Sequence, residues 1–145
     1  MNPGLILYAE DDENDVFLMQ HAFRRAGIEN PLQIVTDGQS AIDYLEGKKE
    51  FENRNQFPFP KLVLLDLKLP VQSGLEVLKW IRTSPTCCTL PVIMITSSNQ
   101  DSDIHRAYIL GVNSYLVKPG KPDELLAMVN AVRDFWLNLN QASCS

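Results

Sequence analysis

The chain has 145 residues, of which 45% are hydrophobic and 21% are charged, as in an ordinary globular domain. Its net charge of -5 argues against binding to nucleic acid, whose phosphates repel an acidic surface. No apolar stretch is long enough to cross a bilayer, and the first apolar run is too short for a signal peptide. We therefore expect a single domain over residues 1–145 that is cytoplasmic and binds no membrane.

The three cysteines do not form a disulfide framework. Cys87 and Cys88 are adjacent, so a bridge between them would be badly strained, and Cys144 lies in the tail. Metal binding by the adjacent pair would need further ligands that the spacing does not supply. A reducing compartment is the simplest interpretation.

Two hydrophobic periodicities alternate along the chain. Short, continuous apolar runs, typical of strands covered on both faces, occupy residues 5–9, 32–35, 62–65, 91–95 and 115–117. Stretches with helical spacing follow them, at residues 13–26, 40–46, 74–83, 101–110 and from 122 onwards. Terminal signals support these bounds, namely Asp12, Gly27, Gly47, Gly111 and Pro122. Five strands that alternate with five helices predict an α/β fold with a parallel sheet between two helical layers.

One long irregular segment, an insertion at about residues 48–61, interrupts this alternation. It contains Phe57-Pro58-Phe59-Pro60, and its prolines exclude a regular helix. We expect a surface insertion whose aromatic side chains pack against the body of the domain. Contact with a partner is the alternative, because loops of this length are often functional.

Polar side chains follow four of the five predicted strands, at the edge of the sheet where sites form in such folds. In order of the strands they are Glu10-Asp11-Asp12, Asp66, Thr96-Ser97-Ser98 and Lys118-Pro119. Each group alone has an ordinary interpretation as a helix cap or a solvated turn residue. Their joint occurrence at successive strand ends indicates a site, and we call this edge the rim.

The residue types at the rim predict phosphoryl chemistry with a metal ion. Clustered carboxylates repel one another and need a cation, and oxygen ligands suit Mg2+. A carboxylate is also able to act as a nucleophile and form an aspartyl-phosphate. Lys118 would neutralise charge on the phosphoryl group, and Thr96 would donate a hydrogen bond to it.

Four ordered motifs give the chain a resemblance to the receiver domains of two-component response regulators. They are Leu7-Tyr8-Ala9-Glu10-Asp11-Asp12, Leu64-Leu65-Asp66-Leu67-Lys68-Leu69-Pro70 with Gly74, Ile95-Thr96-Ser97, and Tyr115-Leu116-Val117-Lys118-Pro119. The resemblance covers nearly the whole chain. It implies a flavodoxin-like, doubly wound (βα)5 sandwich with strand order 2-1-3-4-5, and it leaves no room for an output domain.

The resemblance also implies a role for each rim residue. Asp66 matches the phosphoacceptor, Asp11 the direct Mg2+ ligand, and Glu10 a ligand that acts through water. The backbone carbonyl of Lys68 is expected to complete the metal site. The switch and phosphate-sensing positions match Thr96, Tyr115 and Lys118, and the family implies a cis bond before Pro119.

A histidine kinase is the implied phosphodonor, and an unknown downstream protein is the implied recipient of the signal. More narrowly, the chain resembles receivers paired with bacterial and cyanobacterial phytochrome kinases. That resemblance rests on the insertion before Leu62, on residues 110–115 and on the Asp134-Phe135-Trp136-Leu137 run. The resemblance implies that the chain is not an enzyme, although we expect it to assist its own phosphorylation and dephosphorylation.

Two other functions fit parts of the pattern. A phosphohydrolase would use the same aspartyl-phosphate, but such enzymes usually carry a second Asp two residues after the nucleophile, where this chain has Lys68. A flavin-binding module would share the strand pattern. Its first loop should be rich in Ser, Thr and Gly to hold phosphate, whereas this chain has three acids there.

Two histidines and two late aromatic residues lie outside these motifs. His21 and His105 fall on predicted helices away from the rim, where a surface position is the simpler interpretation than phosphotransfer. Phe135 and Trp136 lie late in the last helix, where apolar side chains beyond the body would need to be covered. A homodimer contact there is a hypothesis.

Overall fold

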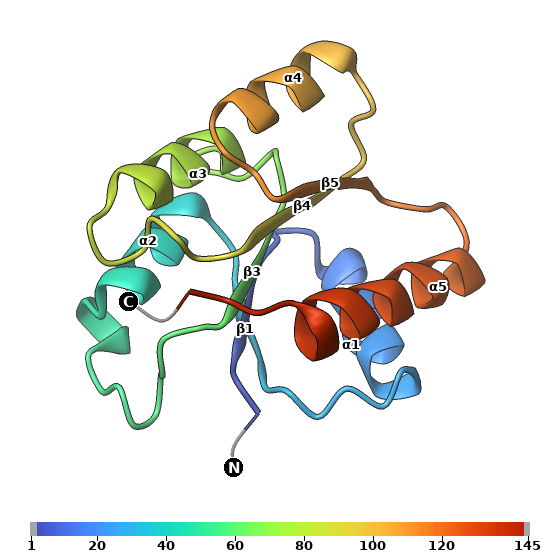
Figure 1. Ribbon diagram of the computed structural model, residues 1–145, viewed down its shortest axis with the longest axis horizontal. Helices are drawn as coiled ribbons and strands as arrows, with labels where there is room; N and C mark the ends of the chain where they lie inside the picture. Colours follow the sequence, from blue (N-terminus) through green and yellow to red (C-terminus); the bar gives the residue numbers. More distant parts are fainter. Residues whose placement is uncertain (1–2, 144–145) are drawn as a thin grey trace.

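Each of the five apolar runs forms a strand of one parallel sheet in the computed structural model, which describes residues 3–143 (Figure 1). The strands are β1 (Ile6–Ala9), β2 (Leu32–Val35), β3 (Leu62–Leu65), β4 (Val92–Thr96) and β5 (Ser114–Val117). Their order in the sheet is β2-β1-β3-β4-β5, and every neighbouring pair is parallel. The predicted flavodoxin-like fold and strand order are confirmed.

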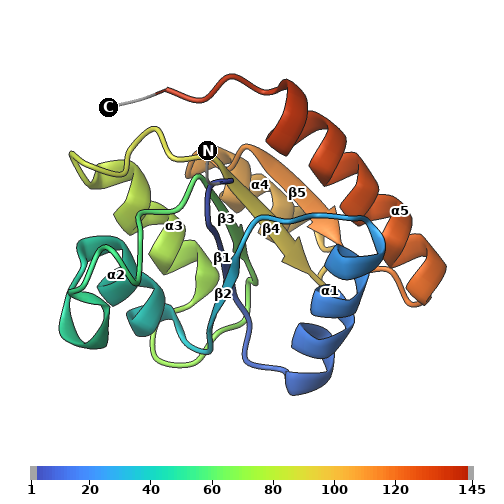
Figure 2. The ribbon, with the colours of Figure 1, turned by 90° about the horizontal axis from the view of Figure 1, so that it is seen from below.

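Five helices cover the two faces of this sheet. They are α1 (Glu13–Arg25), α2 (Gly38–Glu46), α3 (Gly74–Thr83), α4 (Asp101–Ile109) and α5 (Pro122–Val132). The view of Figure 2 separates the layers: α1 and α5 lie on one side of the sheet, and α2 and α3 lie on the other. Helix α4 packs on the same face as α2 and α3 through the buried Ala107.

Alternate strand residues bury their side chains in two separate cores, as the period of a strand requires. Those that face α2, α3 and α4 include Leu7, Ala9, Val63, Leu65 and Met94. Those that face α1 and α5 include Ile6, Tyr8, Leu62, Leu64 and Ile93. Because both faces are covered, β1 and β3 are buried throughout, which explains why their sequences are apolar without alternation.

The helix ends follow the capping signals of the sequence. The Asp12 carboxylate accepts a hydrogen bond from the backbone N–H of Asp15 at 2.9 Å and starts α1. Helix α2 begins two residues earlier than expected, at Gly38, because Asp37 caps it by accepting from the N–H of Ser40 at 2.7 Å. These ends determine where each helix leaves the rim.

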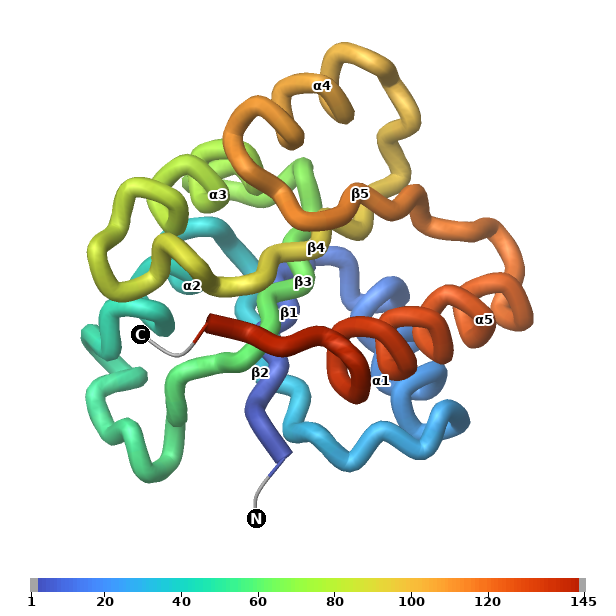
Figure 3. The backbone as a smooth tube through the Cα atoms, viewed as in Figure 1, coloured from blue at the N-terminus to red at the C-terminus, as the bar shows by residue number. Residues whose placement is uncertain are grey.

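The insertion at residues 48–61 lies beside α2, as the backbone tube of Figure 3 shows. It contains one short 3-10 turn, Lys49–Phe51, and Phe51 and Phe57 pack edge to face with ring centroids 5.3 Å apart. Tyr44 of α2 donates a hydrogen bond to the Pro58 carbonyl at 2.8 Å. The expected packing against the body is confirmed for these two rings, whereas Phe59 is 44% exposed.

The last helix changes its geometry towards its carboxyl end. Helix α5 continues into a π-helical segment, Arg133–Leu139. Arg133, the first residue of this segment, donates a hydrogen bond from Nη1 to the Ala26 carbonyl at 2.6 Å. Within residues 3–143, no helix combines the length and the apolar character that crossing a membrane requires.

Candidate functional site

Asp66 follows β3, the central strand, and its side chain is buried at the carboxyl edge of the sheet. Its backbone N–H donates to the Ala9 carbonyl at 3.1 Å, which continues the pairing of β1 with β3. The start of α3 lies so close that a Cβ on Gly74 would come within 2.1 Å of the Asp66 carbonyl oxygen. Glycine at residue 74 therefore allows α3 to begin directly behind the candidate phosphoacceptor.

Glu10 is fully buried after β1, and both of its carboxylate oxygens accept hydrogen bonds. Oε1 accepts from Lys118 Nζ at 2.5 Å and from the Tyr8 hydroxyl at 3.3 Å. Oε2 accepts from the backbone N–H of Asp12 at 3.2 Å. Burial raises the pKa of Glu10 to about 7, although the hydrogen bond from Lys118 acts in the opposite direction.

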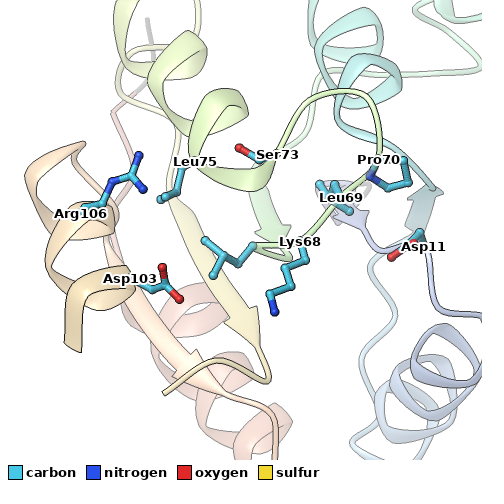
Figure 4. A pocket seen from close by; sticks show the side chains of 9 residues that line it. Asp11, Lys68, Leu69, Pro70, Ser73, Leu75, Asp103 and Arg106 are labelled. Atoms are coloured by element: carbon cyan, nitrogen blue, oxygen red, sulfur yellow. The ribbon is translucent and has the colours of Figure 1, made fainter. Parts of the chain in front are cut away.

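Glu10, Asp11 and Asp66 together form a carboxylate cluster. One oxygen from each lies within 4.8 Å of the other two. Asp11 is exposed and lines an open hollow of about 560 Å³ that also involves Lys68 and Asp103, as Figure 4 shows. The donor set is all oxygen and carries excess negative charge, so these residues fit a hard divalent cation.

Lys118 supplies the cation that partly balances this cluster. Its Nζ donates to Glu10, to Asp15 at 2.8 Å and to Asp66 Oδ2 at 3.2 Å. Burial alone would lower the pKa of Lys118, but the hydrogen bonds to Asp15 and Glu10 raise it above its ordinary value. The ammonium group therefore stays charged beside Asp66.

Thr96 and Tyr115 lie on the other side of the rim and meet at the backbone of Ser98. The N–H of Ser98 donates to the Thr96 hydroxyl at 3.4 Å, and the Tyr115 hydroxyl donates to the Ser98 carbonyl at 3.0 Å. The Ser98 hydroxyl in turn donates to Asp103 of α4 at 2.6 Å. A displacement of Thr96 would thus reach both β5 and α4 through one residue.

One structural feature implied by the family resemblance is corrected. No peptide bond is cis within residues 3–143, so the bond between Lys118 and Pro119 is trans. Trans is the more stable isomer of such a bond by about 0.5–1 kcal/mol, and it prevails where packing does not impose cis. Lys118 reaches the carboxylates from this trans backbone.

Two residues of the site were missed in the sequence. Tyr8 was assigned only to a strand, and its hydroxyl reaches Glu10 because Glu10 has the same side-chain direction two residues later. Asp15 was treated as part of the first helix. It lies on the same helical stripe as the buried residues Met19, Ala22 and Ala26. A carboxylate on an apolar stripe is the sequence signal that could have indicated a role for Asp15.

The residues that were set aside lie away from the rim, as expected. His21 and His105 are exposed on α1 and α4. Cys87 is buried and Cys88 is exposed, and both are free thiols, while Cys144 lies outside the described residues. Within residues 3–143, the carboxylate cluster includes none of these two histidines and two cysteines.

Sequence comparisons place the chain among response regulators. Residues 6–130 match the model of the response regulator receiver domain. The chain is 38% identical over 141 residues to the probable methanogenesis regulatory protein FilR2 of Methanothrix harundinacea, covering 97% of this chain and 88% of FilR2. It is also 38% identical over 135 residues to the response regulator Rcp1 of Synechocystis, covering 93% and 90% of the two chains.

Solved structures agree with this placement. The phosphorylated cyanobacterial phytochrome response regulator RcpA superimposes with a TM-score of 0.89 at 33% identity, covering 97% of this chain and 99% of RcpA. The Mn2+-bound form of Rcp1 superimposes with a TM-score of 0.88 at 36% identity, covering 98% and 100%. The fold, the acidic rim and these relatives agree: the chain belongs to the family of response regulator receiver domains.

Proposed function

We propose that the chain works as a single-domain response regulator that accepts a phosphoryl group on Asp66 from a histidine kinase. The observation that carries this proposal is the surroundings of Asp66: a buried carboxylate at the end of the central strand, 3.2 Å from an ammonium and within 4.8 Å of two further carboxylates. Such a group combines a nucleophile, a counter-charge and a cation site.

In the proposed step, a carboxylate oxygen of Asp66 forms a bond to the phosphorus of the donor. The bond between that phosphorus and the leaving group of the donor breaks in the same step. In a kinase the leaving group is a histidine nitrogen, which takes up a proton. The carboxylates of Asp11, Asp66 and Glu10 are the groups that would hold Mg2+, and the family resemblance adds the Lys68 carbonyl. When bound, Mg2+ supplies positive charge to the phosphoryl oxygens.

The proposed signal is a change of surface around α4 and β5. Phosphorylation adds about -1.5 to -2 charges at Asp66, and Thr96 offers the hydroxyl that would move to meet them. Thr96 is hydrogen-bonded to Ser98, which holds both Tyr115 and Asp103, so this movement would shift a two-state equilibrium of that face. If phosphorylation changed the affinity for a partner as much in Thr96→Ala as in the wild type, this route would be contradicted.

Intact-protein mass spectrometry after incubation with a small phosphodonor tests the phosphoacceptor. We expect a gain of one phosphoryl group that requires Mg2+, is abolished by a chelator and is absent from Asp66→Asn. The Asp12→Asn variant is a matched control, because it removes a rim carboxylate outside the cluster and retains an oxygen that caps α1. A gain that persists in Asp66→Asn would identify a different acceptor.

For the kinase we propose a phytochrome-type donor in the cytoplasm. Support comes from the likeness to Rcp1 and RcpA over nearly the whole chain. FilR2 is 38% identical to the chain, as Rcp1 is, but it is a probable methanogenesis regulatory protein, so the donor needs its own test. Phosphotransfer from a phytochrome kinase should be at least tenfold faster than from a kinase of another class, and equal rates would remove the light-sensing assignment.

The alternative activity, hydrolysis of small phosphoesters through the same aspartyl-phosphate, has weaker support. Lys68 stands where a phosphohydrolase would need a second carboxylate, and it is exposed. Asp103, the acid across the hollow, is already hydrogen-bonded to Ser98. We expect no turnover of a generic phosphoester beyond the slow loss of the protein's own phosphoryl group.

We also propose that the chain self-associates through the π-helical segment. Phe135 is 51% exposed and Leu139 is 69% exposed, whereas Trp136 packs against the core shared by α1 and α5. Burying such apolar side chains is favourable. Analytical ultracentrifugation should show weaker association for Phe135→Ala than for the wild type, and an identical sedimentation profile would count against this interface.

A further inference from the structure

Asp15 contacts the phosphate-sensing position from an element that contributes nothing else to the rim. It lies in the first turn of α1 and accepts a hydrogen bond from Lys118 Nζ at Oδ2, 2.8 Å away. The two residues are 103 positions apart in the chain. This ion pair therefore links α1 to the end of β5 beside the phosphoacceptor.

The ammonium group of Lys118 has three protons and meets three carboxylates. The acceptor distances are 2.5 Å to Glu10, 2.8 Å to Asp15 and 3.2 Å to Asp66. The Lys118 side chain is only 15% exposed, so water does not replace a lost acceptor easily. Each carboxylate thus fixes one direction of the ammonium, and Asp66 is the farthest of the three.

We propose that Asp15 is a positioning residue: it holds the ammonium of Lys118 in place for the phosphoryl group on Asp66. Its effect on rate rests on the proposed function, whereas the contact itself does not. A lysine side chain has a flexible four-carbon stem, so its ammonium group can occupy many positions. Hydrogen bonds to Glu10 and Asp15 reduce the number of these positions. Without Asp15, the ammonium would pair with Glu10 and point less often at Asp66.

A role of Asp15 in helix stability alone does not account for this geometry. An acid in the first turn favours a helix through the macrodipole, and Glu13 fulfils the same condition in the same turn. Glu13 is exposed, whereas Asp15 is half-buried on the stripe that contains Met19. Glu13→Gln is therefore the matched control, since it removes a first-turn charge without disturbing Lys118.

The test measures phosphorylation at saturating small phosphodonor by intact mass in Asp15→Ala, Asp15→Asn and Glu13→Gln. We expect about a tenfold slower rate in Asp15→Ala, as for the loss of one hydrogen bond to a charged group. Asp15→Asn keeps an acceptor oxygen and should fall between Asp15→Ala and the wild type. Glu13→Gln should stay within twofold of the wild type.

A double-mutant cycle with Lys118→Ala separates positioning from general structure. If Asp15 acts through Lys118, adding Asp15→Ala to Lys118→Ala should change the rate by less than twofold. An equal effect of Asp15→Ala in both backgrounds would overturn the proposal. Identical rates of Asp15→Asn and Asp15→Ala would also overturn it, because they would indicate a loss of charge at the rim and not of position.

A second readout does not depend on phosphorylation. The side-chain ammonium signal of Lys118 in nitrogen-15 NMR spectra of the unphosphorylated protein should shift and broaden in Asp15→Ala, and remain in place in Glu13→Gln. An unchanged Lys118 signal overturns the positioning role even if the rates cannot be measured in Lys118→Ala. If the wild type gains no phosphoryl group at Asp66, the proposed function fails, and this spectrum still decides the contact.

Discussion

Two polar clusters at opposite ends of the sheet use a half-buried cation in different ways. At the amino ends of β4 and β5, Arg82 donates to neutral acceptors: the carbonyls of Gly111, Leu90 and Cys88, and Asn113 Oδ1. At the carboxyl ends, Lys118 faces three carboxylates, with Asp11 nearby. The first cluster is balanced in hydrogen-bond donors and acceptors and joins elements, whereas the second carries surplus negative charge.

The difference shows where this molecule sacrifices stability for function. Arg82 ties α3 to the turn before β5 at 2.7 Å, and Asn113 also accepts from the backbone N–H of Val92 at 2.7 Å. The carboxylates at the rim repel one another until a cation binds or phosphorylation changes the charge. This repulsion lowers the stability of the fold, as is usual at functional sites.

The largest effect should come from breaking the balanced cluster. Arg82→Ala leaves the partly buried carbonyls of Gly111 and Leu90 without this donor, and we expect the free energy of unfolding to fall by about 2–4 kcal/mol. Urea denaturation measures this change. Phosphorylation of the molecules that remain folded should keep the wild-type rate, and a lost rate at full stability would reverse the comparison.

The second effect concerns the pH dependence of stability without metal. Burial raises the pKa of Glu10 to about 7 from an ordinary value near 4.5, so the folded chain binds more protons than the unfolded chain between these values. This contribution is complete below the ordinary pKa and is lost as pH rises through about 7. The free energy of unfolding in chelator should therefore fall by about 1–3 kcal/mol over this range.

The control for this pH effect is Glu10→Gln, which has no proton to exchange. Its stability in chelator should lack the decline that the wild type shows as the pH rises from about 4.5 to about 7. Parallel curves for the two proteins would mean that another group causes the slope. Added Mg2+ should flatten the wild-type curve, since a cation favours the charged form of Glu10.

The smallest effect on stability should come from relieving repulsion at the rim. Asp11 is exposed and forms part of the carboxylate cluster, so Asp11→Asn should stabilise the metal-free protein by about 0.5–1 kcal/mol. The same variant should bind Mg2+ at least tenfold more weakly by calorimetry. Glu13→Gln should do neither, and destabilisation by Asp11→Asn would show that the rim is not under charge repulsion.

The fold was predictable because its signals are local and repeated. Strands such as Leu62–Leu65 are continuous apolar runs, and ends such as Asp12 and Gly47 carry capping chemistry. Helix α2 starts two residues before the predicted helix at 40–46, because Asp37 caps it and Gly38 is its first residue. The π-helical continuation of α5 had no sequence signal that distinguishes it from an ordinary helix.

The site was predictable only as far as strand ends determine it. Glu10, Asp66 and Lys118 follow strands directly and Thr96 ends β4, so the topology alone brings them to one edge. Asp15 reaches the site from within a helix, and the Ser98 contacts depend on loop geometry. Such contacts come from three-dimensional packing, which residue type and spacing do not encode on their own.

The most direct test of the account locates the phosphoryl group chemically. After phosphorylation with Mg2+, borohydride reduction converts an aspartyl-phosphate to homoserine, and peptide mass spectrometry identifies the position. We predict homoserine at residue 66 and nowhere else in the chain. Homoserine at residue 11, or a phosphoryl group on His21 or His105 with residue 66 intact, would contradict the central claim that Asp66 is the phosphoacceptor.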